Sequence, residues 1–115
     1  MSDKLQNVVK TLSEREKLSA TIWLIIGILQ CCAFSPVGIW NIYCATQGFK
    51  KAKNVLNPWQ GIVASYDSQL TYIIIILIIN LFFGWGFGVI GALYDLIAIR
   101  GYVLENKQLF EEEGF

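Results

Sequence analysis

The sequence predicts an all-α integral membrane protein made of two transmembrane helical hairpins, with an amphipathic helix at the N-terminus. Two tracts, 18–49 and 68–94, contain no charged residue. The first would form a helix of about 48 Å, although the hydrocarbon core of a bilayer is only about 30 Å thick. Hydrophobic residues make up 55% of the 115-residue chain and charged residues 16%, which is too apolar for a soluble domain of this size. The chain is therefore expected to form a single membrane domain.

Residues 1–17 are predicted as the amphipathic helix followed by a cap. Apolar side chains recur at i, i+3, i+4 and i+7 from Leu5 to Leu12, and polar residues take the other side. Ser13 and Glu16 have the spacing of a capping box. A second helix is therefore expected to begin at Ser13 and to enter the membrane near Leu18.

Residues 18–56 are predicted as the first hairpin. Pro36 cannot continue the helix that precedes it, and Ser35 is placed to cap the helix that follows. The second helix should end near Val55, just after the lysines between Lys50 and Lys53. Cations at that point suit both lipid headgroups and the negative end of the helix dipole.

Residues 70–104 are predicted as the second hairpin. Four glycines lie between Gly84 and Gly91, and they allow two interpretations. In the first, 84–88 is a turn between two helices. In the second, one tilted helix runs through to Ile99 and packs through its small residues. The turn is favoured because the two halves of the chain resemble each other.

An internal repeat relates the two hairpins at a shift of 50 residues. At this shift Thr21 overlays Thr71, Ile25 overlays Ile75 and Gln30 overlays Asn80, and after a three-residue insertion Gly38 overlays Gly91. Such parallel repeats would enter the membrane from the same face.

Two polar segments flank the second hairpin. Residues 57–69 are predicted as an interfacial loop, in which Trp59 and Tyr66, together with Tyr72 after it, lie at headgroup level. Residues 105–115 carry four glutamates and are predicted as a solvated acidic tail, with a docking site for a basic partner as the alternative.

The basic residues fall on one side of the predicted topology. With four spans, both termini and the segment after Lys50 share a side, and all nine Lys and Arg residues lie there. The positive-inside rule makes that side cytoplasmic, which predicts a multi-pass protein of the cell membrane. Spans of about 16 to 18 residues are at the short limit. The hairpins therefore either thin the bilayer or enter it without crossing fully.

Four polar residues are predicted to form a layer within the membrane: Gln30, Asn41, Asn80 and Asp95. Unpaired amides and carboxyl groups are costly in lipid, so these side chains are expected to bond to one another and to fix the helix packing. The alternative is a proton or cation path through Asp95, because an ionisable residue at membrane depth is a candidate functional group.

Small residues predict close helix packing. Gly38, Gly84, Gly88 and Gly91 are expected to let helices approach closely enough to gain contacts that lipid cannot match. These surfaces, together with the lipid bilayer itself, predict the partners: a second copy of the chain or a larger membrane protein.

The sequence contains no recognisable catalytic constellation. The chain contains no histidine, the commonest general base and metal ligand. Cys31, Cys32 and Cys44 form no C-x-x-C pair, so they are expected to be buried thiols, with S-acylation as the alternative. No catalytic residue, cofactor or metal site is predicted. A formal net charge of zero, without a basic face, argues against nucleic acid as a partner.

Two resemblances accompany these patterns. The paired cysteines before Ser35-Pro36-Val37-Gly38-Ile39 and the basic end of that hairpin resemble the dispanin family, which implies a re-entrant helix and acylated cysteines. The usual Gly-Asp after that hairpin is absent. The chain as a whole, through the segments 38–41 and 94–104, is similar to small bacterial membrane proteins of unassigned function. Some of those have an N-terminal zinc ribbon, which this sequence lacks.

The function predicted from these features is that of a non-enzymatic, membrane-embedded structural or interaction subunit. One alternative is a small oligomeric channel or holin-like pore, lined by Asp95 and the amide layer. The other is an immunity or accessory protein that binds a membrane toxin or a secretion component.

Overall fold

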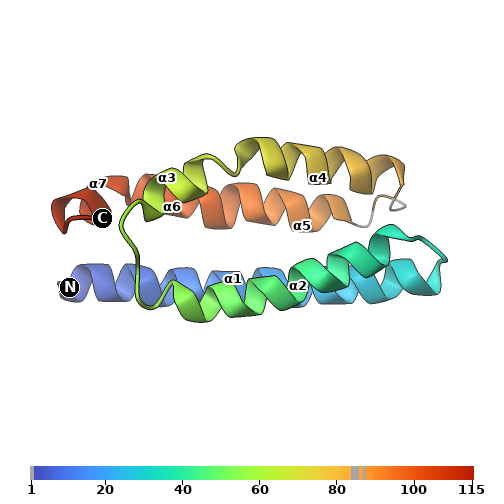
Figure 1. Ribbon diagram of the computed structural model, residues 1–115, viewed down its shortest axis with the longest axis horizontal. Coiled ribbons are helices and arrows are strands. Elements are labelled where there is room, and N and C mark those ends of the chain that lie inside the picture. Colours follow the sequence, from blue (N-terminus) through green and yellow to red (C-terminus); the bar gives the residue numbers. More distant parts are fainter. Residues whose placement is uncertain (1, 84–85, 87) are drawn as a thin grey trace.

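The computed structural model describes residues 2–83, 86 and 88–115, and its described part is all-helical, as predicted. Two antiparallel helical hairpins lie side by side, with both turns at one end of the molecule and both termini at the other (Figure 1). The molecule measures 47 × 22 × 17 Å. The helices are α1 (Asp3–Cys32), α2 (Val37–Asn54), α3 (Ile62–Asp67), α4 (Leu70–Phe82), α5 (Gly88–Tyr94), the π-helical segment η1 (Asp95–Arg100), α6 (Gly101–Glu105) and α7 (Lys107–Glu112).

Helix α1 is a single helix of 30 residues, so the predicted break at Ser13 is wrong. The helix is capped at Ser2, whose hydroxyl accepts from the Leu5 backbone N–H at 3.2 Å. The Ser13 hydroxyl instead donates to the Ala52 carbonyl of α2 at 2.5 Å. Buried positions recur along α1 in alternating steps of four and three: Leu5, Val9, Leu12, Glu16, Ser19, Trp23, Ile26 and Gln30. This heptad spacing keeps one face of α1 against the bundle over its whole length.

In both hairpins a residue with a positive φ follows the first helix. After α1, Phe34 takes a positive φ of 62° and the Ser35 N–H donates to the Gln30 carbonyl at 2.8 Å. After α4, Gly86 takes a φ of 75° and its N–H donates to the Asn80 carbonyl at 2.9 Å. A left-handed residue that lets the chain bond back to the last helical turn is a common helix ending. Helix α4 ends at Phe82 and α5 begins at Gly88, so the alternative of one helix running through to Ile99 is wrong. Residues 84, 85 and 87 of the predicted turn lie outside the described residues.

The end of the molecule opposite the turns has its own hydrophobic core. Helices α3, α6 and α7 pack there against the first turns of α1, as the left side of Figure 1 shows. The fully buried Tyr66 and Phe110 belong to this core. Tyr66 therefore faces this core, and the predicted acidic tail packs on it through Phe110, while Glu105, Glu111 and Glu112 stay exposed. The C-terminal carbonyl of Phe115 even accepts from the Gly61 N–H at 3.2 Å.

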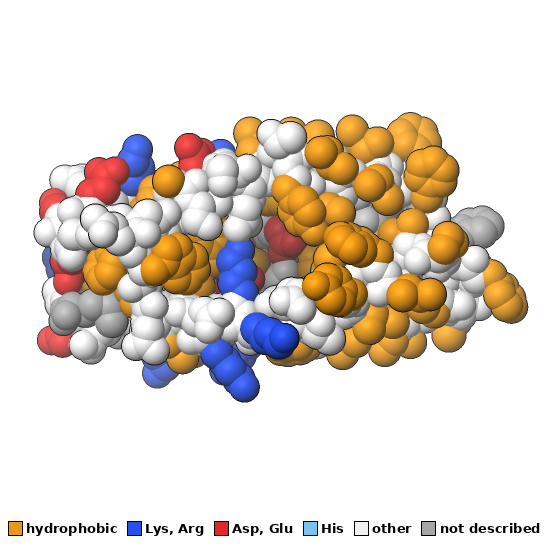
Figure 2. All heavy atoms as spheres, viewed as in Figure 1, with side chains coloured by type: hydrophobic (Ala, Val, Ile, Leu, Met, Phe, Trp, Pro, Cys, Tyr) orange, Lys and Arg blue, Asp and Glu red, His pale blue; other side chains and the backbone are white. Residues whose placement is uncertain are grey.

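The outer surface divides into two zones along the long axis. In the described residues, every exposed large hydrophobic side chain lies within 18–56 or 70–97. Figure 2 shows these side chains gathered over the turn end, while Lys, Arg, Asp and Glu side chains lie over the middle and the opposite end. By length and composition, one helical stretch of the described chain, Ile62–Phe82, is long and apolar enough to cross a membrane.

Candidate functional site

Three of the four predicted polar-layer residues meet in the centre of the bundle. Gln30 Nε2 donates to Asn80 Oδ1 at 3.0 Å, and Asn41 Nδ2 donates to both Asn80 Oδ1 at 2.8 Å and Gln30 Oε1 at 2.5 Å. Asn80 Nδ2 in turn donates to the Ile76 carbonyl at 2.9 Å. All three amides are at most 1% exposed. This amide cluster ties α1 and α2 of the first hairpin to α4 of the second.

Asp95 does not belong to the amide cluster, so the prediction that it pairs with Asn41 and the other amides is wrong. Its carboxylate accepts from the Ser19 hydroxyl, and from Trp23 Nε1 at 2.8 Å. Both donors lie on α1, four residues apart and therefore on the same helix face. The carboxylate is held by neutral donors, and it has no salt bridge in the described part of the chain.

The π-helical segment η1 begins at Asp95 and positions it. Single π-turns within α-helices loosen the regular i→i−4 ladder and often mark functional sites. Arg15 of α1 stabilises this segment, because its guanidinium donates to the Ala98 carbonyl at 2.8 Å and lies 4.2 Å from the ring centre of Tyr102. Arg100, at the end of η1, pairs with Asp67 at 2.8 Å and not with Asp95.

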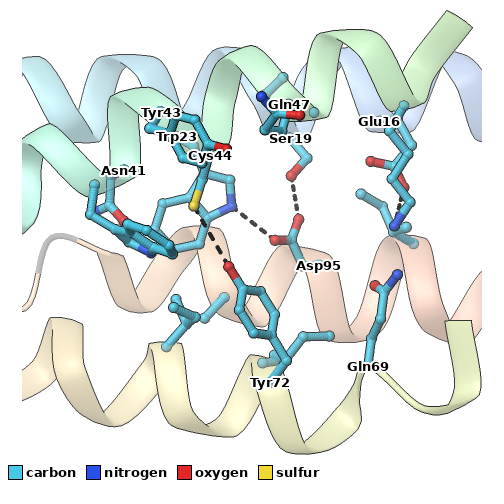
Figure 3. A pocket seen from close by; sticks show the side chains of 18 residues that line it. Glu16, Ser19, Trp23, Asn41, Tyr43, Cys44, Gln47, Gln69, Tyr72 and Asp95 are labelled. Atoms are coloured by element: carbon cyan, nitrogen blue, oxygen red, sulfur yellow. Dashed lines mark hydrogen bonds and ion pairs between the residues drawn. The ribbon is translucent and has the colours of Figure 1, made fainter.

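A cavity of about 420 Å³ lies between the two hairpins, beside Asp95 (Figure 3). Its walls come from α1, α2, α4 and the α5–η1 helix. Trp40, Asn41 and Ile76 line the part nearest the turns, and Glu16, Lys51 and Gln69 line the part nearest the polar end. The remaining lining residues are Ser19, Ala20, Trp23, Tyr43, Cys44, Gln47, Gly48, Tyr72, Ile73, Ala92, Asp95 and Ile99. The cavity thus joins aromatic rings, aliphatic side chains and two carboxyl groups.

Glu16 is the second carboxyl group of the cavity, and its own partners satisfy it. Tyr66 Oη donates to Glu16 Oε1 at 2.8 Å, and Lys51 Nζ lies 3.7 Å from the same oxygen. Burial raises the pKa of Glu16 above its ordinary value, although Lys51 and Tyr66 oppose that rise. Lys51 also lies 4.3 Å from the ring centre of Tyr66. This lysine is the one basic residue among the lining residues, and it is already engaged.

The predicted packing glycines lie inside the bundle and not on its outer surface. A Cβ on Gly38 would come within 2.6 Å of the Gly27 carbonyl, and one on Gly91 within 2.8 Å of the Trp23 ring. One on Gly88 would collide with Asn80. These three glycines therefore allow close packing within one copy of the chain and supply no surface for association. Gly84 lies outside the described residues.

The cysteines also differ from the prediction, since Cys31 and Cys32 are exposed at the turn end. Only Cys44 is partly buried, and its Sγ lies 3.6 Å from Tyr72 Oη in the cavity wall. In the described residues, no group of three or more Cys, Asp or Glu side chains could hold a metal ion.

Sequence reasoning missed Ser19, Trp23 and the true role of Glu16. The pattern that would have revealed them is the heptad of α1, in which Glu16, Ser19 and Trp23 follow Leu12 at steps of four, three and four. The capping-box interpretation of Glu16 placed a helix boundary inside this heptad and hid it. Three polar or amphipathic residues on one helix face predict a shared polar site.

The fold and the cavity together define an all-helical protein with one candidate membrane-spanning stretch and an acidic, aromatic-lined cavity between two hairpins. No protein-family model, curated protein or solved structure matches the chain. The two family resemblances therefore stay predictions.

Proposed function

We propose that this protein is a non-enzymatic, membrane-embedded interaction subunit, whose two hairpins enter the bilayer from the cytoplasmic side. In this proposal the turn end lies in the membrane as four short spans, and the termini remain in the cytoplasm. Its partner is a second copy of the chain or a larger membrane protein.

The separation of the surface into two zones carries this proposal. The polar end buries its large hydrophobic side chains in a core of its own, as a soluble protein does. The turn end instead exposes Ile74, Ile75 and Ile78 of α4 by 43–49% and Phe82 by 73%. An exposed apolar surface of this extent is rare on soluble monomers and is expected where lipid or another protein covers it. All nine Lys and Arg residues lie outside the charge-free tracts, which supports cytoplasmic termini.

The amide cluster favours a packing role over a pore. Gln30, Asn41 and Asn80 are buried and bonded to one another, whereas a conducting path needs polar groups that face water. The purified protein in liposomes is therefore expected to show no ion flux above that of empty liposomes. Sustained flux would favour the pore instead.

Membrane fractionation tests the proposal. The wild-type protein should stay in the membrane after alkaline carbonate extraction. Replacing both Ile75 and Ile78 by Lys should release it or leave it aggregated, since a lysine at the centre of a span costs about 2.5–3.5 kcal/mol. Replacing both Gln6 and Asn7 by Lys, which adds the same two charges at exposed positions of the polar end, should behave as wild type. A wild-type protein that appears in the soluble fraction would contradict membrane insertion.

The interaction role needs a separate measurement. The mass of the wild-type particle in nanodiscs should exceed that of one chain, through a second copy or a co-purifying membrane protein. A single chain at all concentrations, with no partner recovered from native membrane, would contradict this part of the proposal.

A further inference from the structure

We propose that the cavity between the hairpins binds an amphipathic organic cation, with the positive headgroup against the Asp95 carboxylate and the hydrocarbon part along the apolar wall. The inference does not rest on the proposed interaction role, because the cavity is formed within one chain.

The charge of the cavity points to a cation. Glu16 and Asp95 are its acidic lining residues, and Lys51 is its basic one. Lys51 is held by Glu16 at 3.7 Å and by the Tyr66 ring at 4.3 Å. Asp95 forms no ion pair in the described residues, because Arg100 pairs with Asp67 and Lys51 pairs with Glu16. A carboxylate accepts about four hydrogen bonds, and within the described part of the chain Asp95 receives those of Ser19 and Trp23 alone.

The walls point to an organic cation with an apolar portion. Rings of Trp23, Trp40, Tyr43 and Tyr72 line the cavity (Figure 3), and aromatic faces attract quaternary ammonium groups through cation–π interactions. The aliphatic side chains of Ile73, Ile76 and Ala92 continue the wall. A metal ion would instead need several oxygen ligands in a close group, which the described residues do not provide.

A second observation points to a ligand at the inner end of the cavity. Asn41 is 1% exposed, yet its Oδ1 has no hydrogen-bond partner in the described structure. A buried polar atom without a partner is costly. A hydroxyl or ammonium N–H donor on the bound molecule would satisfy it.

The cavity also opens at the boundary between the charged and apolar zones of the surface, where an amphiphile is expected to bind. It is open on one side, between α2 and α4, at the level where the charged and apolar zones of the surface meet. In Figure 2 an acidic side chain is visible at the bottom of a hollow at this level. A molecule with a charged head and an apolar tail collects at such a boundary.

Direct binding of decyl(2-hydroxyethyl)dimethylammonium, a cation with one hydroxyl donor, below its micelle-forming concentration tests the inference on wild-type protein in an uncharged maltoside detergent. Calorimetry should show saturable binding at one site per chain for this cation and none for decyl sulfate. Asp95→Asn should weaken binding by about tenfold or more, since it removes the charge that pairs with the headgroup. Glu105→Gln, which removes an exposed carboxyl outside the cavity, should bind as wild type. Equal affinity of folded Asp95→Asn and wild type would overturn the inference.

Thiol protection gives a second readout that needs no variant. Cys44 lines the cavity, whereas Cys31 and Cys32 are exposed at the turns. The cation should slow maleimide labelling of Cys44 and leave labelling of the other two cysteines unchanged. Labelling of Cys44 at the same rate with and without the cation, or equal protection by decyl sulfate, would refute binding at this cavity.

The same titration in nanodiscs separates the two sources of such a headgroup. At a fixed share of phosphatidylglycerol, which keeps the surface charge constant, the apparent affinity should be lower with phosphatidylcholine than with phosphatidylethanolamine as the remaining lipid if a choline lipid is the resident ligand. It should be equal in the two if the ligand is a free amphiphile. Either result supports a site for organic cations. Uptake that rises linearly with concentration in both lipids, without saturation, would show partition into the bilayer only and would reject the site.

Discussion

Asn80 is the side chain on which the amide cluster depends. Its Oδ1 accepts from both Gln30 and Asn41, and its Nδ2 donates to the Ile76 carbonyl. These bonds join the two hairpins at a depth where water cannot replace them. In lipid or a dry protein interior, a bond of this kind stabilises only if every partner is satisfied.

Replacing Asn80 by Leu is expected to lower stability by about 1–2 kcal/mol, because it removes the buried oxygen to which both Gln30 and Asn41 donate. The midpoint of denaturant unfolding in micelles measures this loss. Gln47→Leu is the matched control, since Gln47 is an exposed amide, and it should shift the midpoint little. Equal shifts for the two variants would contradict the role given to the cluster.

Glu16 should make stability depend on pH. Burial raises its folded-state pKa above the ordinary value of 4.5, so the folded protein binds this proton more readily than the unfolded chain. The resulting stabilisation is complete below pH 4.5 and is lost as pH rises through the folded-state pKa.

The difference between wild type and Glu16→Gln isolates this effect. Gln keeps an oxygen that can accept from Tyr66 but does not titrate. Relative to wild type, Glu16→Gln should therefore gain stability as pH rises from 4.5 towards neutrality. Thermal midpoints measured across this range test the expectation, with Glu105→Gln as the exposed control. Parallel pH curves for wild type and Glu16→Gln would show that the folded and unfolded pKa values coincide.

Individual residues were harder to place from sequence than the elements that carry them. Gln30, Asn41 and Asn80 lie at similar distances along the chain from the two turns, which predicted that they share one level of the bundle. Their amides do bond to one another there. Asp95 has a similar apolar setting, but the π-turn that begins there changes its orientation. Nothing in the residue pattern indicated that turn, so the bonds to Ser19 and Trp23 were not foreseen.

At the scale of helices, the continuity of α1 has a direct test. Glu14 would be the first helical residue if a capping box at Ser13 began a new helix, and proline is well tolerated at that position. Inside a continuous helix, proline removes a hydrogen bond and clashes with the preceding turn. Glu14→Pro is therefore expected to destabilise the protein by about 3 kcal/mol.

Glu14→Ala is the control for that substitution, because Glu14 is exposed and alanine suits a helix interior. Helical content by circular dichroism and the unfolding midpoint both report the result. A Glu14→Pro protein as stable as Glu14→Ala would mean that the chain breaks at Ser13 after all.

Helices α1 and α2 approach closely at Gly27 and Gly38. Gly38→Ala should destabilise the hairpin by about 1–3 kcal/mol, because the new Cβ would press on backbone atoms that cannot move aside. Gly101 offers a matched control, since its nearest neighbour to an added Cβ is 3.5 Å away. Gly101→Ala should be neutral or stabilise by up to about 1 kcal/mol. Unfolding midpoints for the pair check the packing, and a neutral Gly38→Ala would contradict it.

Element boundaries that rest on strong local chemistry were predictable. Proline at 36, the lysines before Val55 and the glycines after Phe83 marked three helix ends, and all three hold. The helices α3 and α7 were not predicted, because they are short and obtain their stability from the shared core and not from their own sequence. Helix α6 coincides with the end of the last helix of the predicted second hairpin.

The whole molecule combines a polar end with its own core and an apolar end with an apolar exterior. Helix α1 passes through both without a break. The extended polar end was read from sequence as separate peripheral segments, since long-range contacts such as those of Phe110 with the start of α1 leave no local pattern. The apolar end was predictable, because long tracts without charged residues indicate by composition alone that their surroundings are apolar.

In the proposed orientation, the length of the apolar zone sets how deep the turns lie in the bilayer. From Lys17 to Cys32 α1 rises by about 22 Å, and from Lys50 back to Val37 α2 rises by about 20 Å. Both values fall short of a hydrocarbon core of about 30 Å. The shortfall is about 8 to 10 Å, and mismatch costs fractions of a kcal/mol per Å, so local thinning of the bilayer can bring the turns to the far surface.

Labelling of intact cells with a membrane-impermeant maleimide is expected to show this topology. The native Cys31 and Cys32 are exposed at the turn end and should react from outside. A cysteine placed by Lys107→Cys, in a chain whose native cysteines are replaced by serine, should react only after the cells are opened. Reaction of that cysteine in intact cells would reverse the orientation. Protection of Cys31 and Cys32 in intact cells, with labelling after detergent is added, would show that the hairpins enter the bilayer and return without crossing it.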